Sequence, residues 1–358
     1  MHIEIMERYQ LDRKKIEDDG IEYLTSLENK MDFEQVVLLV GTFFDEKEAR
    51  KQMATYCMKV TDYACVKAAF EYTSLYNLEE EQGMLFERYQ DDPLLKGHIL
   101  VYDLARESKK SKGKTSHIME AARTLYGQVH DDSLKLKLDL ILQYELLIND
   151  QHTVEKFYES MVMKLRNLDP SYVKTVLLTR LVHYYSRSLF MDSDDWEEAE
   201  KNCLANIVNP LAPPFFKGSA HQIAGYILAF SSKIECSLSH LWKAIHYYEV
   251  SENFDAAKRV TTTVIPFCLN LHKKQMPSKI NFHEIDKVEQ AHYFILHNER
   301  SKAVCLLQDI ITSDSSHFKA NLYWAFLKRD LSHLMRLACD YNRNAFELNL
   351  IKLFANRL

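Results

Sequence analysis

The stretch QAHYFILHNERSKAVCLLQDI, residues 290–310, places two small residues twelve positions apart on either side of a polar break. Ala291 comes first, and Ala303 follows beyond the break HNERS. Around them, apolar residues recur at intervals of three and four, which is the period of a helix with one buried face. Two helices that cross so closely that only Ala or Gly fits between them need this spacing. The stretch therefore predicts a tightly packed helical hairpin.

The same offsets return in three other windows. SRSLFMDSDDWEEAEKNCLANI, AGYILAFSSKIECSLSHLWKA and KAIHYYEVSENFDAAKRVTTT repeat them from Arg187, Gly225 and Ala244, respectively. Ala244 serves in two windows, so the repeat length is not constant. This arrangement is typical of tetratricopeptide repeats, which carry a small residue on the first helix and, on the second helix, a small residue followed by an apolar one. The sequence thus predicts an all-α protein, a tetratricopeptide-like α-solenoid of degenerate helical hairpins.

Composition supports the fold class and suggests a domain plan. The 358 residues include only 8 Gly and 7 Pro, fewer turn formers than a β-rich protein needs. Residues 1–50 hold 13 acidic and 7 basic side chains, a balance of −6, and the remainder holds 38 of each sign. We expect a short acidic segment at 1–20 and a solenoid over 21–358 with a bend near 206–218. Without a long apolar run or a leader pattern, the expected location is the cytoplasm.

Motifs that carry catalysis or cofactor binding are not found. The sequence contains no glycine-rich nucleotide loop, no H-E-x-x-H zinc motif and no G-x-S-x-G elbow. We therefore expect no enzymatic activity, no cofactor and no metal. Four lysines in ESKKSKGKTSH (107–117) could contact phosphates, but a solvated loop between helices is the simpler interpretation.

The first helices of such hairpins form the concave wall of a solenoid. Positions three before and one after the small residue are expected to face the groove; they are Tyr184, Ser188, Gln222, Tyr226, Val288 and His292. Together with Arg187, these side chains suit the backbone and polar ends of an extended peptide. The alternative is that the aromatic residues only pack between helices, and the sequence leaves both interpretations open.

The stretch KINFHEIDKVEQAHYFILHNERSKAVCLLQDI resembles the C-terminal third of the AimR family, the arbitrium receptors that regulate lysis and lysogeny in Bacillus phages. Two earlier segments also resemble the family and occur in the same order as in its members. They are the block TYCMKVTDYACVKAAFEYTSLYN (55–77) and the Thr-Arg pair at 179–180. The resemblance implies an intracellular receptor with a tetratricopeptide-like solenoid. Such a receptor binds a short secreted peptide and controls transcription.

Departures from the family pattern shape the expectations for this chain. Residues 1–20 are too short and too acidic for the family's helix-turn-helix head, so DNA binding is not expected. Arg187 stands where the family has a peptide-binding Asn, and Asn344 stands at an acidic position. Arg187 would select a carboxylate, or else would only pair with Asp192 or Asp194. A homodimer is possible, although the family's terminal leucine-rich helix has no counterpart after LIKLFANRL.

Three functions fit these observations. The first is an AimR-like receptor for a short peptide or a protein partner, with Tyr184, Arg187, Ser188, Gln222, Tyr226, His292 and Asn344 as binding residues. The second is a DNA-binding regulator with a degenerate head. The third is an interaction scaffold that takes no peptide ligand.

Overall fold

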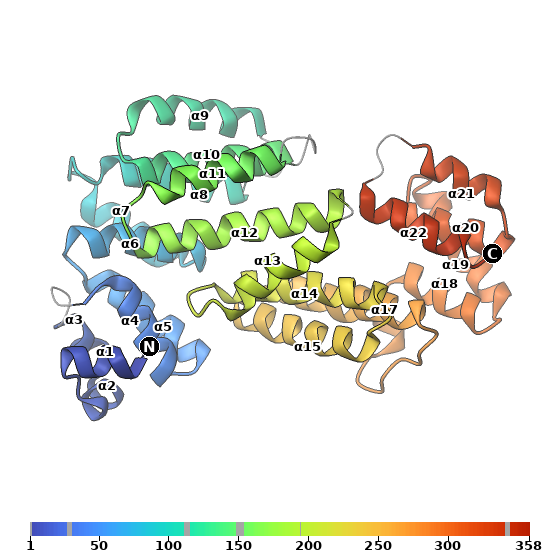
Figure 1. Cartoon of the computed structure of the whole chain (residues 1–358), viewed down its shortest axis with the longest axis horizontal. Coiled ribbons are helices and arrows are strands. Elements are labelled where there is room, and N and C mark those ends of the chain that lie inside the picture. The colour runs from blue at the N-terminus through green and yellow to red at the C-terminus, as the bar shows by residue number, and fades with distance from the viewer. Residues whose placement is uncertain (1, 27–30, 111–114, 148–153, 194, 341–343) are drawn as a thin grey trace. The chain divides into compact units, whose positions relative to one another are not determined.

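The structure is a computed structural model that describes residues 2–26, 31–110, 115–147, 154–193, 195–340 and 344–358. Within these ranges every regular element is a helix, which confirms the predicted all-α fold (Figure 1). None of the helices in these ranges is both long and apolar enough to cross a membrane.

The described residues form two compact units. Unit 1 comprises Met1–Val182 and Asn209–Pro213, and unit 2 comprises His183–Val208 and Pro214–Leu358. The boundary falls inside helix α12 (Tyr172–Asp192), where no glycine or proline marks it in the sequence. The predicted bend at 206–218 includes residues 209–213, which belong to unit 1. A single solenoid over 21–358 stays a prediction.

Unit 1 is built from short helices around one apolar core. Its helices are α1 (His2–Tyr9), α2 (Arg13–Asp19), α3 (Ile21–Thr25), α4 (Phe33–Phe43), α5 (Glu46–Lys59), α6 (Tyr63–Leu75), α7 (Glu79–Tyr89), α8 (Lys96–Lys110), α9 (Thr115–Gln128), α10 (Asp132–Leu147), α11 (Val154–Arg166) and the first part of α12. The acidic segment 1–20 forms α1 and α2; Ile5 of α1, Leu11 between the two helices and Ile16 of α2 are buried in this core. Asp12 caps α2 by accepting a hydrogen bond from the Lys14 amide at 2.9 Å.

Unit 2 consists of helices that pair as hairpins. They are the last part of α12, α13 (Trp196–Val208), α14 (Pro214–Phe230), α15 (Ile234–Val250), α16 (Phe254–Arg259), the π-helical turn η1 (Val260–Val264), α17 (Ile265–Leu271), the 3₁₀ turn η2 (Phe282–Glu284), α18 (Lys287–Leu296), α19 (Arg300–Ser313), α20 (Phe318–Lys328), α21 (Leu331–Ala338) and α22 (Ala345–Ala355). All three tryptophans of the chain (Trp196, Trp242 and Trp324) belong to this unit.

The small residues do allow a close helix crossing in the α14–α15 hairpin. A Cβ atom on Gly225 would lie 2.6 Å from Cδ2 of Leu241, which is too close for any side chain without movement. The Ser237 hydroxyl donates a hydrogen bond to the Gly225 carbonyl at 2.6 Å, so the two backbones nearly touch. In the α18–α19 hairpin, Ala291 and Ala303 are both fully buried. In the α14–α15 hairpin the predicted spacing therefore corresponds to a close contact of the two helices, whereas Arg187, at the corresponding position of α12, is exposed.

Replacing Ala303 with leucine should overpack the α18–α19 crossing, because the added atoms have no space at a fully buried position. We expect a loss of about 1–3 kcal/mol in the free energy of unfolding. Urea denaturation followed by tryptophan fluorescence measures it. Ser301→Leu, at an exposed position of the same helix, is the control. A urea midpoint equal to that of the control would contradict the assigned packing.

A recurring turn joins the helices without glycine. Ser232, Glu252 and Asn298 each have a left-handed backbone, with φ of 59°, 56° and 62°. In each case the next residue's amide bonds back across the turn, as from Asn253 to the Tyr248 carbonyl at 2.8 Å. This is the Schellman pattern, in which glycine is usual at the left-handed position. The chain makes these turns with polar residues, which explains how so few glycines suffice.

Candidate functional site

The residues predicted to bind a ligand all belong to unit 2. Tyr184, Arg187 and Ser188 lie on α12, Gln222 and Tyr226 on α14, His292 on α18, and Asn344 directly before α22. They differ widely in exposure, and the structure gives several of them a structural contact.

Arg187 is exposed on α12 and makes no hydrogen bond or ion pair with the part of the chain that is described. Its expected structural partner, Asp192, instead accepts a hydrogen bond from the Ser188 hydroxyl at 2.9 Å. Burial raises the pKa of Asp192, and the nearby charge of Arg187 opposes this shift. The other proposed partner, Asp194, lies outside the described residues. Arg187 is thus near an acid but remains accessible to a ligand.

Gln222 and Tyr226 lie one turn apart on α14 and are both partly exposed. The Tyr248 hydroxyl of α15 donates a hydrogen bond to Oε1 of Gln222 at 2.9 Å. Burial raises the pKa of Tyr248 to about 12, so this hydroxyl remains a donor at neutral pH. The Tyr226 ring lies 5.6 Å from the ring of Phe190, which is three residues after Arg187 on α12. These contacts connect α12, α14 and α15.

Two predicted site residues have other roles in the structure. His292 is fully buried rather than placed on a groove wall, because Tyr323 and Phe354 cover it, with ring centroids 4.3 and 5.3 Å away. Asn344 caps α22, where its side chain accepts a hydrogen bond from the Glu347 amide at 2.9 Å. Val288 is likewise buried. The helices that follow in the chain cover positions that the local repeat would leave open.

A shallow depression in unit 2 was not foreseen from the sequence. It has a volume of about 430 Å³ and is lined by Trp196, Phe230, Asn349, Leu353 and Asn356. The rings of Trp196 and Phe230 lie 4.8 Å apart. The lining residues come from α13, α14 and α22 and from the turn after α22, so no short motif could reveal them.

The depression adjoins the predicted site through an aromatic cluster. Phe346 of α22 contacts Phe190, Tyr226 and Phe230, with ring centroids 5.2, 5.7 and 5.7 Å away. Apolar walls with a few amide groups are the usual composition of a site for peptides and small ligands. The candidate site is therefore the surface that combines Arg187, Gln222 and Tyr226 with this depression, and we call it the unit 2 surface.

A histidine pair was also missed by the sequence analysis. Nδ1 of His221 on α14 lies 3.0 Å from Nδ1 of His240 on α15, so one ring donates a hydrogen bond to the other. Burial lowers the pKa of His221 to about 4, and the neighbouring His240 adds to this shift. Among the described residues, no group of three or more His, Cys, Asp or Glu is arranged to hold a metal ion. We therefore interpret His221 and His240 as a neutral contact between the two helices of one hairpin.

The lysines that the sequence assigned to a flexible loop are partly helical. Lys109 and Lys110 are the last residues of α8, so the predicted break at 107–117 begins later than expected. Nζ of Lys109 donates to the Asn77 side chain at 2.8 Å and to the Ser74 carbonyl, and Lys110 pairs with Glu79 at 2.6 Å. Lys112 and Lys114 lie outside the described residues. Lys109 and Lys110 are therefore held by contacts within unit 1.

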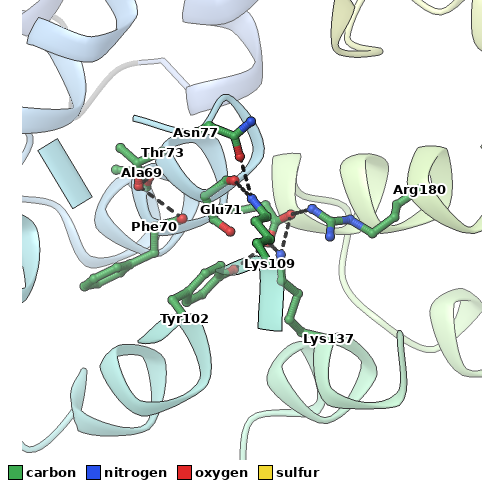
Figure 2. Close-up of polar contacts among 10 residues, drawn as sticks. Ala69, Phe70, Glu71, Thr73, Asn77, Tyr102, Lys109, Lys137 and Arg180 are labelled. Carbon is green, nitrogen blue, oxygen red and sulfur yellow. Dashed lines mark hydrogen bonds and ion pairs between the residues drawn. The ribbon is translucent and has the colours of Figure 1, made fainter. Parts of the chain in front are cut away.

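Unit 1 contains a buried ionic cluster around Glu71 (Figure 2). Nζ of Lys137 donates to both carboxylate oxygens at 2.6 and 2.9 Å, and the Tyr102 hydroxyl donates at 2.7 Å. Arg180 approaches the same carboxylate at 3.4 Å. Burial alone would raise the pKa of Glu71, but Lys137 and Arg180 together hold it below its ordinary value. Glu71 and Lys137 have at most 1% of their side chains exposed, so we assign this cluster to the core of unit 1.

Comparison with known proteins identifies the family. The sequence profile of the family described as AimR transcriptional regulator-like matches residues 49–348. Among solved structures, the one titled "Structure of phAimR-Ligand" matches with a TM-score of 0.66 and 15% sequence identity, covering 92% of this chain and 98% of that chain. No curated protein matches the chain. The structural match shows a shared fold, and the profile spans most of the sequence. This chain belongs to the AimR transcriptional regulator-like family.

Proposed function

We propose that this chain is a regulatory receptor that binds a short peptide, or an extended segment of a protein partner, on the unit 2 surface. The observation that carries the proposal is the family match over residues 49–348. It is supported by the fold shared with a structure whose title names a ligand. The proposed setting is the cytoplasm of a bacterial cell, where the receptor would act in phage lysis–lysogeny control or in related transcriptional control.

The unit 2 surface has the chemistry that a peptide requires. Arg187 offers a guanidinium group for a carboxylate, and Asn349 and Asn356 place amide groups at an apolar depression. An amide side chain can both donate to and accept from a peptide backbone. The apolar wall of Trp196 and Phe230 would accommodate a side chain of the ligand.

A thermal-shift screen with the short peptides encoded beside the gene tests the proposal. A ligand that binds only the folded chain must raise the melting temperature by mass action, by an amount that grows with ligand concentration. We expect at least one of these peptides to raise the melting temperature and a peptide with the same residues in scrambled order to leave it unchanged. If every neighbouring peptide leaves the melting temperature unchanged, a scaffold without a peptide ligand becomes the better account.

Removing the charge of Arg187 should weaken binding without loss of fold. Arg187→Ala is expected to cost about 1.5–3 kcal/mol of binding free energy, the usual size for a hydrogen bond to a charged group. Titration calorimetry with the peptide found above measures it. Arg300→Ala, at another exposed arginine of unit 2, is the control. Unchanged affinity together with lower stability would make Arg187 a structural residue.

The family description favours DNA binding as a second candidate function. Against it, residues 1–50 carry a net charge of −6, and buried residues of α1 and α2 join the unit 1 core. We expect negligible affinity for duplex DNA at physiological salt, because a binding face needs basic residues that neutralise phosphates. A gel-shift assay checks this expectation. Sequence-dependent retention at nanomolar protein would overturn it and would place the regulatory output on DNA.

A further inference from the structure

We propose that His292 is a proton-sensitive latch, which holds helices α18, α20 and α22 of unit 2 together only while its imidazole is neutral. The inference concerns regulation of unit 2 and does not depend on which ligand the unit binds.

His292 is the point at which three helices meet. It belongs to α18 and none of its side chain is exposed. Its ring stacks on Tyr323 of α20 at 4.3 Å and packs against Phe354 of α22 at 5.3 Å. Tyr323 and Phe354 are themselves fully buried. Displacement of this imidazole would therefore separate α18 from α20 and α22.

The surroundings of His292 offer little to stabilise a positive charge. Neither ring nitrogen makes a hydrogen bond to the described part of the chain, and Nδ1 lies 3.7 Å from Oε2 of the Glu289 carboxylate. The Glu289 carboxylate already binds Nζ of Lys319 at 2.7 Å. The Tyr323 hydroxyl faces both of its oxygens at 3.4 Å. The buried Glu289 carboxylate is thus already balanced by a cation.

The other groups around His292 do not change this balance. Lys319 of α20 and Arg357, after α22, are both cations whose charge opposes protonation of His292. From α17, Asn270 donates to the Glu289 backbone carbonyl at 3.0 Å. The neighbouring α19 exposes its charged residues, Arg300, Lys302 and Asp309, to solvent. A protonated His292 would therefore add a second buried cation beside a single carboxylate.

The direction of the pH effect follows from the pKa of the histidine. Burial lowers the pKa of His292, and Glu289 opposes this shift only in part. In the unfolded chain the group titrates near its ordinary value of about 6.5. Its contribution to stability is therefore complete above about pH 6.5 and is lost as the pH falls toward the lower folded-state pKa. Acidification should open the latch, by up to about tenfold in the folding equilibrium constant for each pH unit.

The test compares variants of the full chain by urea unfolding at pH 7.5 and 5.5, followed through the tryptophans of unit 2. His292→Phe keeps a flat ring between Tyr323 and Phe354 but cannot take up a proton. His283→Gln removes an exposed histidine from the same unit and is the control. We expect the wild type and the control to lose stability on acidification and His292→Phe to lose about tenfold less in the unfolding constant. The pair His221–His240 titrates in every variant and cancels from the difference.

Hydrogen exchange of the wild type supplies a readout that does not need the variant to fold. After correction for the intrinsic rates, α18, α20 and α22 should exchange faster at pH 5.5 than at pH 7.5. Equal protection of the three helices at both pH values would overturn the proposal. So would a pH dependence of unfolding in His292→Phe that equals that of the control.

Discussion

Replacing Lys137 with methionine should lower the free energy of unfolding by about 3–5 kcal/mol, which is the usual cost of removing one partner of a buried ion pair. Methionine fills a similar volume but leaves the Glu71 carboxylate without its closest cation, which donates at 2.6 and 2.9 Å. Arg180, at 3.4 Å, is too distant to replace both hydrogen bonds. The loss should appear in hydrogen exchange of α6 and α10 and in the urea midpoint followed by circular dichroism.

The same helix offers a matched control for this variant. Lys135 also lies on α10 and pairs with an acid, Asp132, at 3.5 Å, but 32% of its side chain is exposed. Lys135→Met should therefore cost no more than about 1 kcal/mol. The double variant Glu71→Leu with Lys137→Met should recover much of the loss, because no buried charge pair is then broken. If Lys137→Met and Lys135→Met have equal stability, the buried cluster does not hold unit 1 together.

Truncation of Phe354 to alanine should have a similar effect on unit 2. This ring of α22 is fully buried and lies 5.4 Å from Tyr323 and 5.0 Å from Phe326 of α20. Removing a large buried ring costs about 3–5 kcal/mol, because transfer energy is lost and a cavity remains. Urea unfolding at pH 7.5, followed by tryptophan fluorescence, reports on this unit directly.

Met335→Ala is the control for Phe354→Ala. Met335 lies on α21 with 62% of its surface exposed, so its truncation should change the free energy of unfolding by less than about 0.5 kcal/mol. An unfolding midpoint of Phe354→Ala that equals that of the control would mean that α22 is not packed against α20. The proposed latch at His292 would then lose one of its three helices.

Local spacing in the sequence was sufficient to predict the fold. Gly225 stands where two helices come so close that a larger side chain has no space, and Ala303 is fully buried in its hairpin. The need for a small residue at a helix crossing involves only one hairpin, so the sequence of that hairpin is enough to predict it. The turns at Ser232, Glu252 and Asn298 could not be predicted, because polar residues there take the left-handed conformation that usually indicates glycine.

The candidate site was only partly predictable, because its exposure depends on distant segments. The repeat places His292 beside a small residue, on the face expected to line a groove. Tyr323 and Phe354, which follow 31 and 62 positions later, cover that face in the structure. The ion pair of Glu71 with Lys137 joins residues 66 positions apart, so no local sequence pattern predicts it. Arg187 is exposed, and its role as a binding residue stays a prediction that rests on the family resemblance.

The most direct test of the central claim is hydrogen exchange of the full chain with and without the peptide that gives the largest thermal shift. If the unit 2 surface is the binding site, the peptide should slow exchange in the second half of α12, in α14 and in α22, and Arg187→Ala should reduce this protection at the same peptide concentration. Protection confined to unit 1, or protection that Arg187→Ala leaves unchanged, would contradict the account.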